Sequence, residues 1–156
     1  MQTGYQMEAY VPMIFLGTVV TKSVILEMGP VLAALVVGSR LSANYAAELG
    51  TMRVTEQIDA LEVMGVNSLN YLVFPKIIAM LFYPFVVAIA MYIGILGGWI
   101  AGVFGGFSSS ADFVEGLQLH FIPYHVTYSF IKSIVFAFII ATVPSYHGYY
   151  MKGGAR

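Results

Sequence analysis

Residues 77–104 of this chain read IIAMLFYPFVVAIAMYIGILGGWIAGVF and contain no charged side chain. At about 1.5 Å per residue, a helix of this length would reach roughly 42 Å, which exceeds the ~30 Å hydrocarbon core of a bilayer. The stretch therefore predicts a transmembrane helix, placed at residues 74–104, that crosses with a tilt or a kink. Pro84 is the expected kink point, because a proline removes one hydrogen bond of the helix.

The rest of the chain predicts two further spans. Hydrophobic residues make up 59% of the sequence and charged residues only 10%, whereas a typical soluble domain is roughly 45–50% apolar and about 25% charged. Residues 121–143 form one apolar run, in which Pro123 suits a helix start and Pro144 a helix stop. Residues 18–47 form the other run. We expect an all-α integral membrane protein with about three transmembrane helices.

Composition and motifs argue against several classes of function. The formal net charge is −1 and no basic run alternates with aromatic residues, which argues against nucleic-acid binding. Cysteine is absent, so thiolate chemistry and disulfides are excluded. The sequence has no nucleophile–base motif and no GxxxxGK[ST] loop, so we expect neither an enzyme nor a chain that binds ATP itself. His120 and His125 are off a shared helical face, so we expect no metal site and no directly bound cofactor.

The distribution of Lys and Arg predicts the orientation in the membrane. Residues 48–76 and 145–156 contain such residues, whereas residues 105–120 contain none. The positive-inside rule therefore places the first two segments in the cytoplasm and makes residues 105–120 an outer loop. Tyr146, Tyr149 and Tyr150 lie near the end of a span, a position typical of the aromatic belt at the membrane interface.

The most polar part of the chain is GTMRVTEQIDALEVMG, residues 50–65. Thr51 is a good N-cap and Gly65 a good C′ residue, which predicts a short cytoplasmic helix over residues 51–64. Two interpretations remain open, a connecting helix that packs on the bundle and a docking helix for a soluble partner. At 100° per residue, one face would carry Val54, Ile58, Leu61 and Met64, and the other Thr55, Glu56, Asp59 and Glu62.

Two further patterns mark the spans themselves. Small residues repeat every four positions, which predicts a face that another helix approaches closely. These residues are Gly94, Gly98, Gly102 and Gly106. Charged groups inside a membrane are costly and usually functional, and among those within the predicted spans Glu27 and Lys132 are the candidates for a functional pocket, whereas Arg40 is expected to be structural. Pro30 follows Glu27 closely and removes a helix hydrogen bond, so we expect the local backbone to be available to a cavity.

Two long segments resemble the MlaE/YrbE permease family. The first is LEMGPVLAALVVGSRLSANYAAELGTMRVTEQIDALEVMGVNSLNYLVFPKIIA, residues 26–79, and the second is YSFIKSIVFAFIIATVPSYHGYYMKGGA, residues 128–155. The chain departs from the family at Leu26, where some members have Arg, and at Ser39, where the motif has Gly. The resemblance implies a partial permease domain over residues 1–156 that lacks the first and last spans of the family.

The resemblance also implies a function and partners. Family members are membrane subunits of ABC transporters that move phospholipids and maintain outer-membrane lipid asymmetry from the inner membrane of Gram-negative bacteria. They work as two permease copies with two cytoplasmic ATPase subunits, which use the ATP, and a periplasmic MCE-domain lipid-binding protein. By this resemblance residues 51–64 become the coupling helix, and Glu27 and Lys132 line a lipid pocket at the dimer interface. The ATPase-coupling residues are then Glu48, Arg53, Glu56, Gln57, Asp59 and Glu62.

Two rival interpretations stay open at this level. One is a channel or structural membrane protein whose loop helix docks nothing. The other is an intramembrane enzyme that acts on lipid through Glu27 or His125, although the sequence has no paired catalytic groups at usable spacing.

Overall fold

The computed structural model describes residues 14–151, so the cytoplasmic placement predicted for Lys152 and Arg156 falls outside the described range. Every regular element within residues 14–151 is helical, which confirms the predicted all-α class. Three helical stretches are long and apolar enough to cross a membrane, namely Phe15–Val54, Ser68–Phe104 and Pro123–Tyr149.

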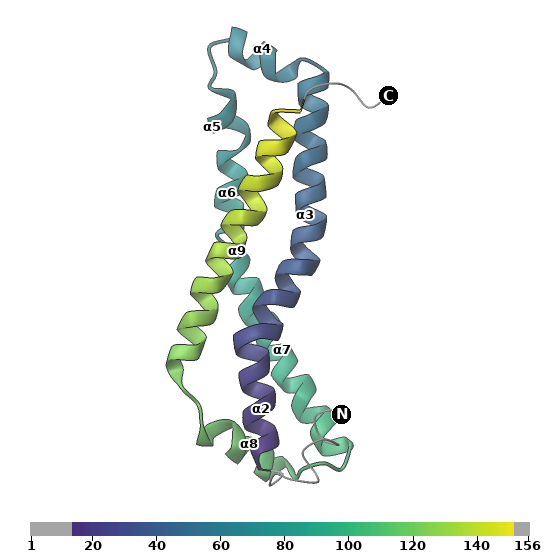
Figure 1. The fold of residues 1–156 in the computed structure, drawn as a ribbon, viewed down its shortest axis with the longest axis vertical. Helices are drawn as coiled ribbons and strands as arrows, with labels where there is room; N and C mark the ends of the chain where they lie inside the picture. Colours follow the sequence, from purple (N-terminus) through teal and green to yellow (C-terminus); the bar gives the residue numbers. More distant parts are fainter. Residues whose placement is uncertain (1–13, 152–156) are drawn as a thin grey trace. The chain divides into compact units, whose positions relative to one another are not determined.

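The helices follow one another along the chain as Figure 1 shows. They are α2 (Phe15–Ser23), the π-helical turn η1 (Val24–Met28), α3 (Gly29–Val54), α4 (Gln57–Val63), α5 (Ser68–Leu72), α6 (Phe74–Met80), α7 (Tyr83–Phe104), α8 (Ser110–Leu119) and α9 (Pro123–Tyr149). The segment predicted as an outer loop, residues 105–120, therefore contains a helix. A capping box fixes the start of α8, because Ser109 and Asp112 bond each other's backbone N–H groups.

The two prolines of the later spans behave differently. Pro84 is the predicted kink point, and the helix is interrupted just before it, because α6 ends at Met80, four residues before the proline, and α7 begins at Tyr83. The helix end predicted at Pro144 is wrong, since α9 continues through it to Tyr149. The last turn carries Ser145 and Tyr149, which are 1% and 7% exposed. Burial of this turn favours a continued helix over a stop, despite the hydrogen bond lost at the proline.

The described residues form two compact units, and the first comprises residues 14–32 and 86–132. Within it α8 packs against the start of α2 (Figure 1). The approach is close enough that a Cβ on Gly116 would collide with the backbone carbonyl of Ile14. Phe113 of α8 is 1% exposed, so its ring supplies the apolar core of this contact.

The glycine repeat of α7 lies against α2 and η1 within the first unit. A Cβ on Gly94 would lie 3.2 Å from Val24, one on Gly98 2.6 Å from Val20, and one on Gly102 3.6 Å from Leu16. Both helices advance in steps of four, so these glycines let the two backbones approach closely. Gly106, the fourth predicted packing residue, lies beyond α7 with φ of 72°. Its role is therefore in the turn, and the prediction is wrong for this residue.

The second unit comprises residues 33–85 and 133–151. Its core consists of Leu49, Ile58, Leu72 and Tyr149, which come from α3, α4, α5 and α9. Helix α4 bridges the end of α3 and the start of α5 (Figure 1). The polar connection between the first two spans is therefore a packed part of the fold.

Candidate functional site

Lys132 and Glu27 form an ion pair within the first unit. The Nζ atom of Lys132 lies 2.8 Å from Oε2 of Glu27, and it also lies 5.9 Å from the ring centre of Tyr128. The lysine side chain is 19% exposed, whereas the glutamate side chain is 67% exposed. The structure thus brings together the two charged residues predicted to line a pocket, with the carboxylate open at the surface of the chain.

The backbone beside the pair explains why a proline follows it. An α-helical N–H at position 30 would donate to the carbonyl of Leu26, but Pro30 has no N–H group. The helix widens to a π-turn over Val24–Met28, and Lys132 Nζ donates to the Leu26 carbonyl over 3.2 Å. The ammonium group therefore joins one carboxylate and one backbone carbonyl, whereas the predicted opening of this backbone to a cavity stays a prediction.

This arrangement makes a charge tolerable at membrane depth. An isolated Lys at the centre of a bilayer costs about 2.5–3.5 kcal/mol on insertion scales. A paired lysine that also donates to a carbonyl avoids much of that cost, whereas removal of one partner leaves the other charge uncompensated. Because the carboxylate of Glu27 remains exposed, the pair has room for a further polar group.

The polar segment between the first two spans begins differently from the prediction. Helix α3 continues to Val54, and Thr51 lies inside it, where its hydroxyl donates to the Ala47 carbonyl over 2.8 Å. The N-cap predicted at Thr51 is therefore wrong, and the short helix is α4, which starts at Gln57. The chain turns at Glu56, whose φ of 59° is left-handed and costs a non-glycine residue about 1–2 kcal/mol.

The end of α4 agrees with the prediction. Gly65 has φ of 77°, its N–H donates to the Glu62 carbonyl over 3.0 Å, and the Val66 N–H donates to the Leu61 carbonyl over 3.1 Å. These two bonds form a Schellman motif, which requires the left-handed conformation that glycine adopts without strain.

The six predicted coupling residues fall into two groups. Four of them are engaged within the second unit. Glu48 pairs with Lys76, Arg53 bonds Asp59 over 2.7 Å, and Glu62 accepts from Ser68 and Tyr149 over 3.0 Å each. Glu56 and Gln57, in contrast, are exposed at the turn into α4.

The faces of α4 are only partly as predicted. Ile58 is fully buried and Leu61 packs on the core cluster, as the periodicity predicts. Met64 and Val54 are 67% and 47% exposed, so their assignment to the packed face is wrong, and Val63 is 89% exposed. Met64 is the C-cap of α4 and lies outside its regular turns, so the helical periodicity does not place its side chain. The outer surface of α4 therefore combines acids with apolar side chains.

Tyr149 is the functional candidate that sequence reasoning missed. Its position near a span end predicts an interfacial ring, but it is 7% exposed. Its hydroxyl lies 2.7 Å from Ser68 Oγ and 3.0 Å from Glu62 Oε1. These three side chains, the α4–α9 clasp, join α4 and the start of α5 to the last turn of α9. The spacing of the tyrosines does not predict the burial of Tyr149, because the nearby Tyr146 and Tyr150 are exposed.

A metal centre has no support in the described part of the chain. Within residues 14–151, no three His, Asp or Glu side chains come together in a way that could hold a metal ion. His120 and His125 both line one pocket of the first unit.

Comparison of the sequence with known proteins shows the family to which the chain belongs. Residues 1–156 match the family described as Permease MlaE. A probable ABC transporter permease protein of Rickettsia bellii is 43% identical over 142 residues, which cover 90% of this chain and 55% of that protein. The intermembrane phospholipid transport system permease protein MlaE of Haemophilus influenzae is 32% identical, over 86% of this chain and 52% of that protein.

A plant relative extends the range of matches. The chloroplastic protein TRIGALACTOSYLDIACYLGLYCEROL 1 of Arabidopsis thaliana is 32% identical over 140 residues, which cover 83% of this chain and 37% of that protein. The chain spans about half the length of the two bacterial relatives, at 55% and 52%.

The α4–α9 clasp yields a first prediction. The substitution Tyr149→Phe removes a buried hydroxyl from Ser68 and Glu62 and should lower the free energy of unfolding by about 1–2 kcal/mol. Thermal unfolding of the purified protein in detergent measures the effect. Tyr146→Phe is the matched control, because Tyr146 is 62% exposed. Equal melting temperatures for the two variants would contradict a role for the clasp.

Proposed function

Because this chain belongs to the MlaE permease family, we propose that it forms part of the membrane subunit of an ATP-driven phospholipid transporter. The observation that carries the proposal is the Lys132–Glu27 pair. The pair lies in predicted membrane-spanning helices, and its carboxylate is 67% exposed. An exposed carboxylate facing lipid tails would be costly, so this surface requires a polar environment in the assembled protein.

Two molecules would supply that polar environment one after the other, a second permease copy and then a phospholipid. A second permease copy would cover the surface around Glu27 and enclose a polar chamber at the dimer interface. A phospholipid headgroup would then enter the chamber, where the Lys132 ammonium attracts its phosphate and the Glu27 carboxylate attracts a cationic amine. The acyl chains would remain against apolar side chains such as Met28, which is 53% exposed.

The outer surface of α4 supports docking of an ATPase. Glu56, Gln57 and Asp59 are exposed there, beside Val63 at 89% and Met64 at 67% exposure. Exposed apolar side chains bordered by charges are typical of protein interfaces. We assign the ATP-binding role to this partner.

The α4–α9 clasp would pass a movement of α4 on to α9. A partner that displaces α4 pulls on Tyr149 through Glu62, and Tyr149 is in the same helix, α9, as Lys132. ATP-driven movement of α4 would therefore bias the position of α9, which carries one half of the ion pair. The remaining elements of the proposal are a periplasmic MCE-domain lipid carrier, an inner-membrane location in a Gram-negative envelope and a role in outer-membrane lipid asymmetry. These rest on the resemblance of the sequence to the family.

Neutralisation of the ion pair tests the transport role. Full-length permease, assembled with its ATPase in liposomes, is assayed for ATP-driven transfer of a fluorescent phospholipid. Lys132→Met and Glu27→Gln should each lower transfer by at least about tenfold, which corresponds to about 1.4 kcal/mol. The double variant should regain stability, because no uncompensated charge remains, but should not regain transfer. Recovery of transfer in the double variant would show that the pair only stabilises the fold.

Charge reversal on α4 tests docking separately. Glu56→Lys combined with Asp59→Lys should lower copurification of the ATPase by at least about tenfold. The partner surface that complements the two acids is basic, so the two lysines would repel it. The protein should still reach the membrane. Asp59→Asn controls for the lost Arg53 pair, and Glu115→Lys, at an exposed acid of α8, controls for net charge. Unchanged copurification would contradict the docking role.

A further inference from the structure

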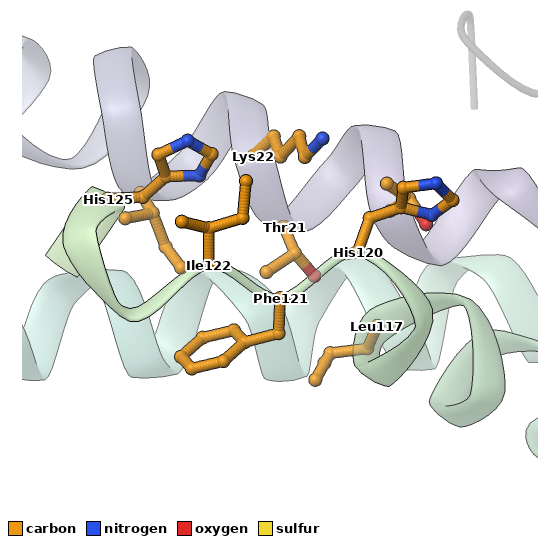
Figure 2. Close-up of a pocket in the computed structure, with 9 residues that line it drawn as sticks. Thr21, Lys22, Leu117, His120, Phe121, Ile122 and His125 are labelled. Atoms are coloured by element: carbon orange, nitrogen blue, oxygen red, sulfur yellow. The ribbon is translucent and has the colours of Figure 1, made fainter.

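A small pocket with a cavity volume of about 10 Å³ lies where α2, the end of α8 and the start of α9 meet in the first unit. Thr21 and Lys22 of α2 line it from one side, and His120, at the end of α8, and His125, in the first turn of α9, line it from the other (Figure 2). Phe121 and other apolar residues complete the wall. The pocket therefore combines cationic or hydrogen-bonding groups with apolar surface.

The polar groups of the pocket favour an anion. None of its lining residues is acidic, and Lys22 forms no ion pair within residues 14–151. An ammonium group offers three hydrogen-bond donors, and each imidazole offers at least one. Several donors around one small space match an oxyanion such as phosphate, which accepts several hydrogen bonds at once.

Thr21 supplies an independent observation. It is 5% exposed, and its hydroxyl has no hydrogen-bond partner within the described residues. Thr18, one turn earlier on α2, is equally buried, but its hydroxyl donates to the Gly116 carbonyl. Buried hydroxyls are normally satisfied, so the unsatisfied one at the pocket wall points to a ligand that supplies the missing partner.

We propose that this pocket binds the phosphate group of a phospholipid, as a second headgroup site on the outer side of the permease. The proposal rests on the proposed transport function for the lipid and on the predicted orientation of residues 105–120 for the outer side. His125 and Lys132 are seven residues apart in α9, which puts them on one face about 10.5 Å apart. Lys22 precedes Glu27 by little more than one turn. The continuous helical stretch Phe15–Val54 carries both Lys22 and Glu27, and α9 carries both His125 and Lys132.

Two sources could supply the phosphate oxyanion, a lipid headgroup or free inorganic phosphate. The apolar wall favours the lipid, because Phe121 and Ile122 are 48% and 46% exposed and can cover glycerol and the first acyl carbons. Free phosphate gains nothing from such a wall. Comparison of the two ligands therefore decides the source.

Calorimetric titration of the full-length permease in detergent tests the site. The ligands are dioctanoyl phosphatidylglycerol, dioctanoylglycerol and inorganic phosphate. All measurements use the Glu27→Gln/Lys132→Met background, so that the ion pair does not contribute. The phosphatidylglycerol should bind at least about tenfold more tightly than either other ligand, since only it has both phosphate and chains. Equal binding of dioctanoylglycerol, or of inorganic phosphate, would overturn the assignment.

Substitutions locate the binding to the pocket. Lys22→Met and the double variant His120→Gln/His125→Gln should each weaken phosphatidylglycerol binding about tenfold. Thr21→Val should weaken it, whereas Thr21→Ser keeps the hydroxyl and should not. His147→Gln and Thr142→Val, at residues outside the pocket, are the matched controls. Unchanged binding in all pocket variants would overturn the site. Loss of binding in these variants, together with an absence of ATP-driven transfer by the permease with Glu27 and Lys132 intact, would instead reject the proposed function and keep the site.

Discussion

One ammonium group, on Lys132, sets the chemistry of the predicted membrane-spanning region. It is held by the Glu27 carboxylate at 2.8 Å and the Leu26 carbonyl at 3.2 Å. The second contact exists because Pro30 cannot bond that carbonyl and the helix widens to a π-turn before it. A proline, a helix irregularity and a charged pair are thus one feature. Each part would be unfavourable alone in a bilayer, and together they satisfy one another.

The glycine repeat of α7 packs against the helical segment that carries Glu27. Val24, the first residue of η1, packs against Gly94, and Val20 and Leu16 pack against the next two glycines. Larger residues at these positions would push the π-turn away from α7. Met91 continues the same contact, because a Cβ on Gly29 would collide with its side chain. Close packing therefore fixes the segment that presents Glu27, and the exposed carboxylate is held in place by its own unit.

Hydrophobic run length and charge placement were enough to predict much of this structure. They predict the helical class, the three long apolar stretches and the two charged residues that meet. These signals are local, or follow from the cost of charge in a membrane. The helix start expected at Thr51 and the stop expected at Pro144 are both wrong, for different reasons. At Pro144 the buried last turn around Tyr149 continues the helix, and at Thr51 the hydroxyl bonds within α3.

Side-chain partners were the least predictable level. Sequence periodicity puts Glu62 on an outward face, yet the Ser68 and Tyr149 hydroxyls bind it, and Tyr149 is distant in the sequence. The histidines likewise have no shared helical face, because the chain leaves α8 at His120 and enters α9 before His125. Only the fold brings them to one pocket. Contacts of this kind depend on how separate helices meet, which no local pattern encodes.

The central claim is that a phospholipid binds where Glu27 meets Lys132. Native mass spectrometry of the full-length permease, purified in detergent, tests this claim most directly. The account predicts that wild-type protein retains phospholipid under detergent washing that removes bulk lipid, and that Glu27→Gln/Lys132→Met retains markedly less. Equal retention by the two proteins, or complete loss from the wild type, would contradict it.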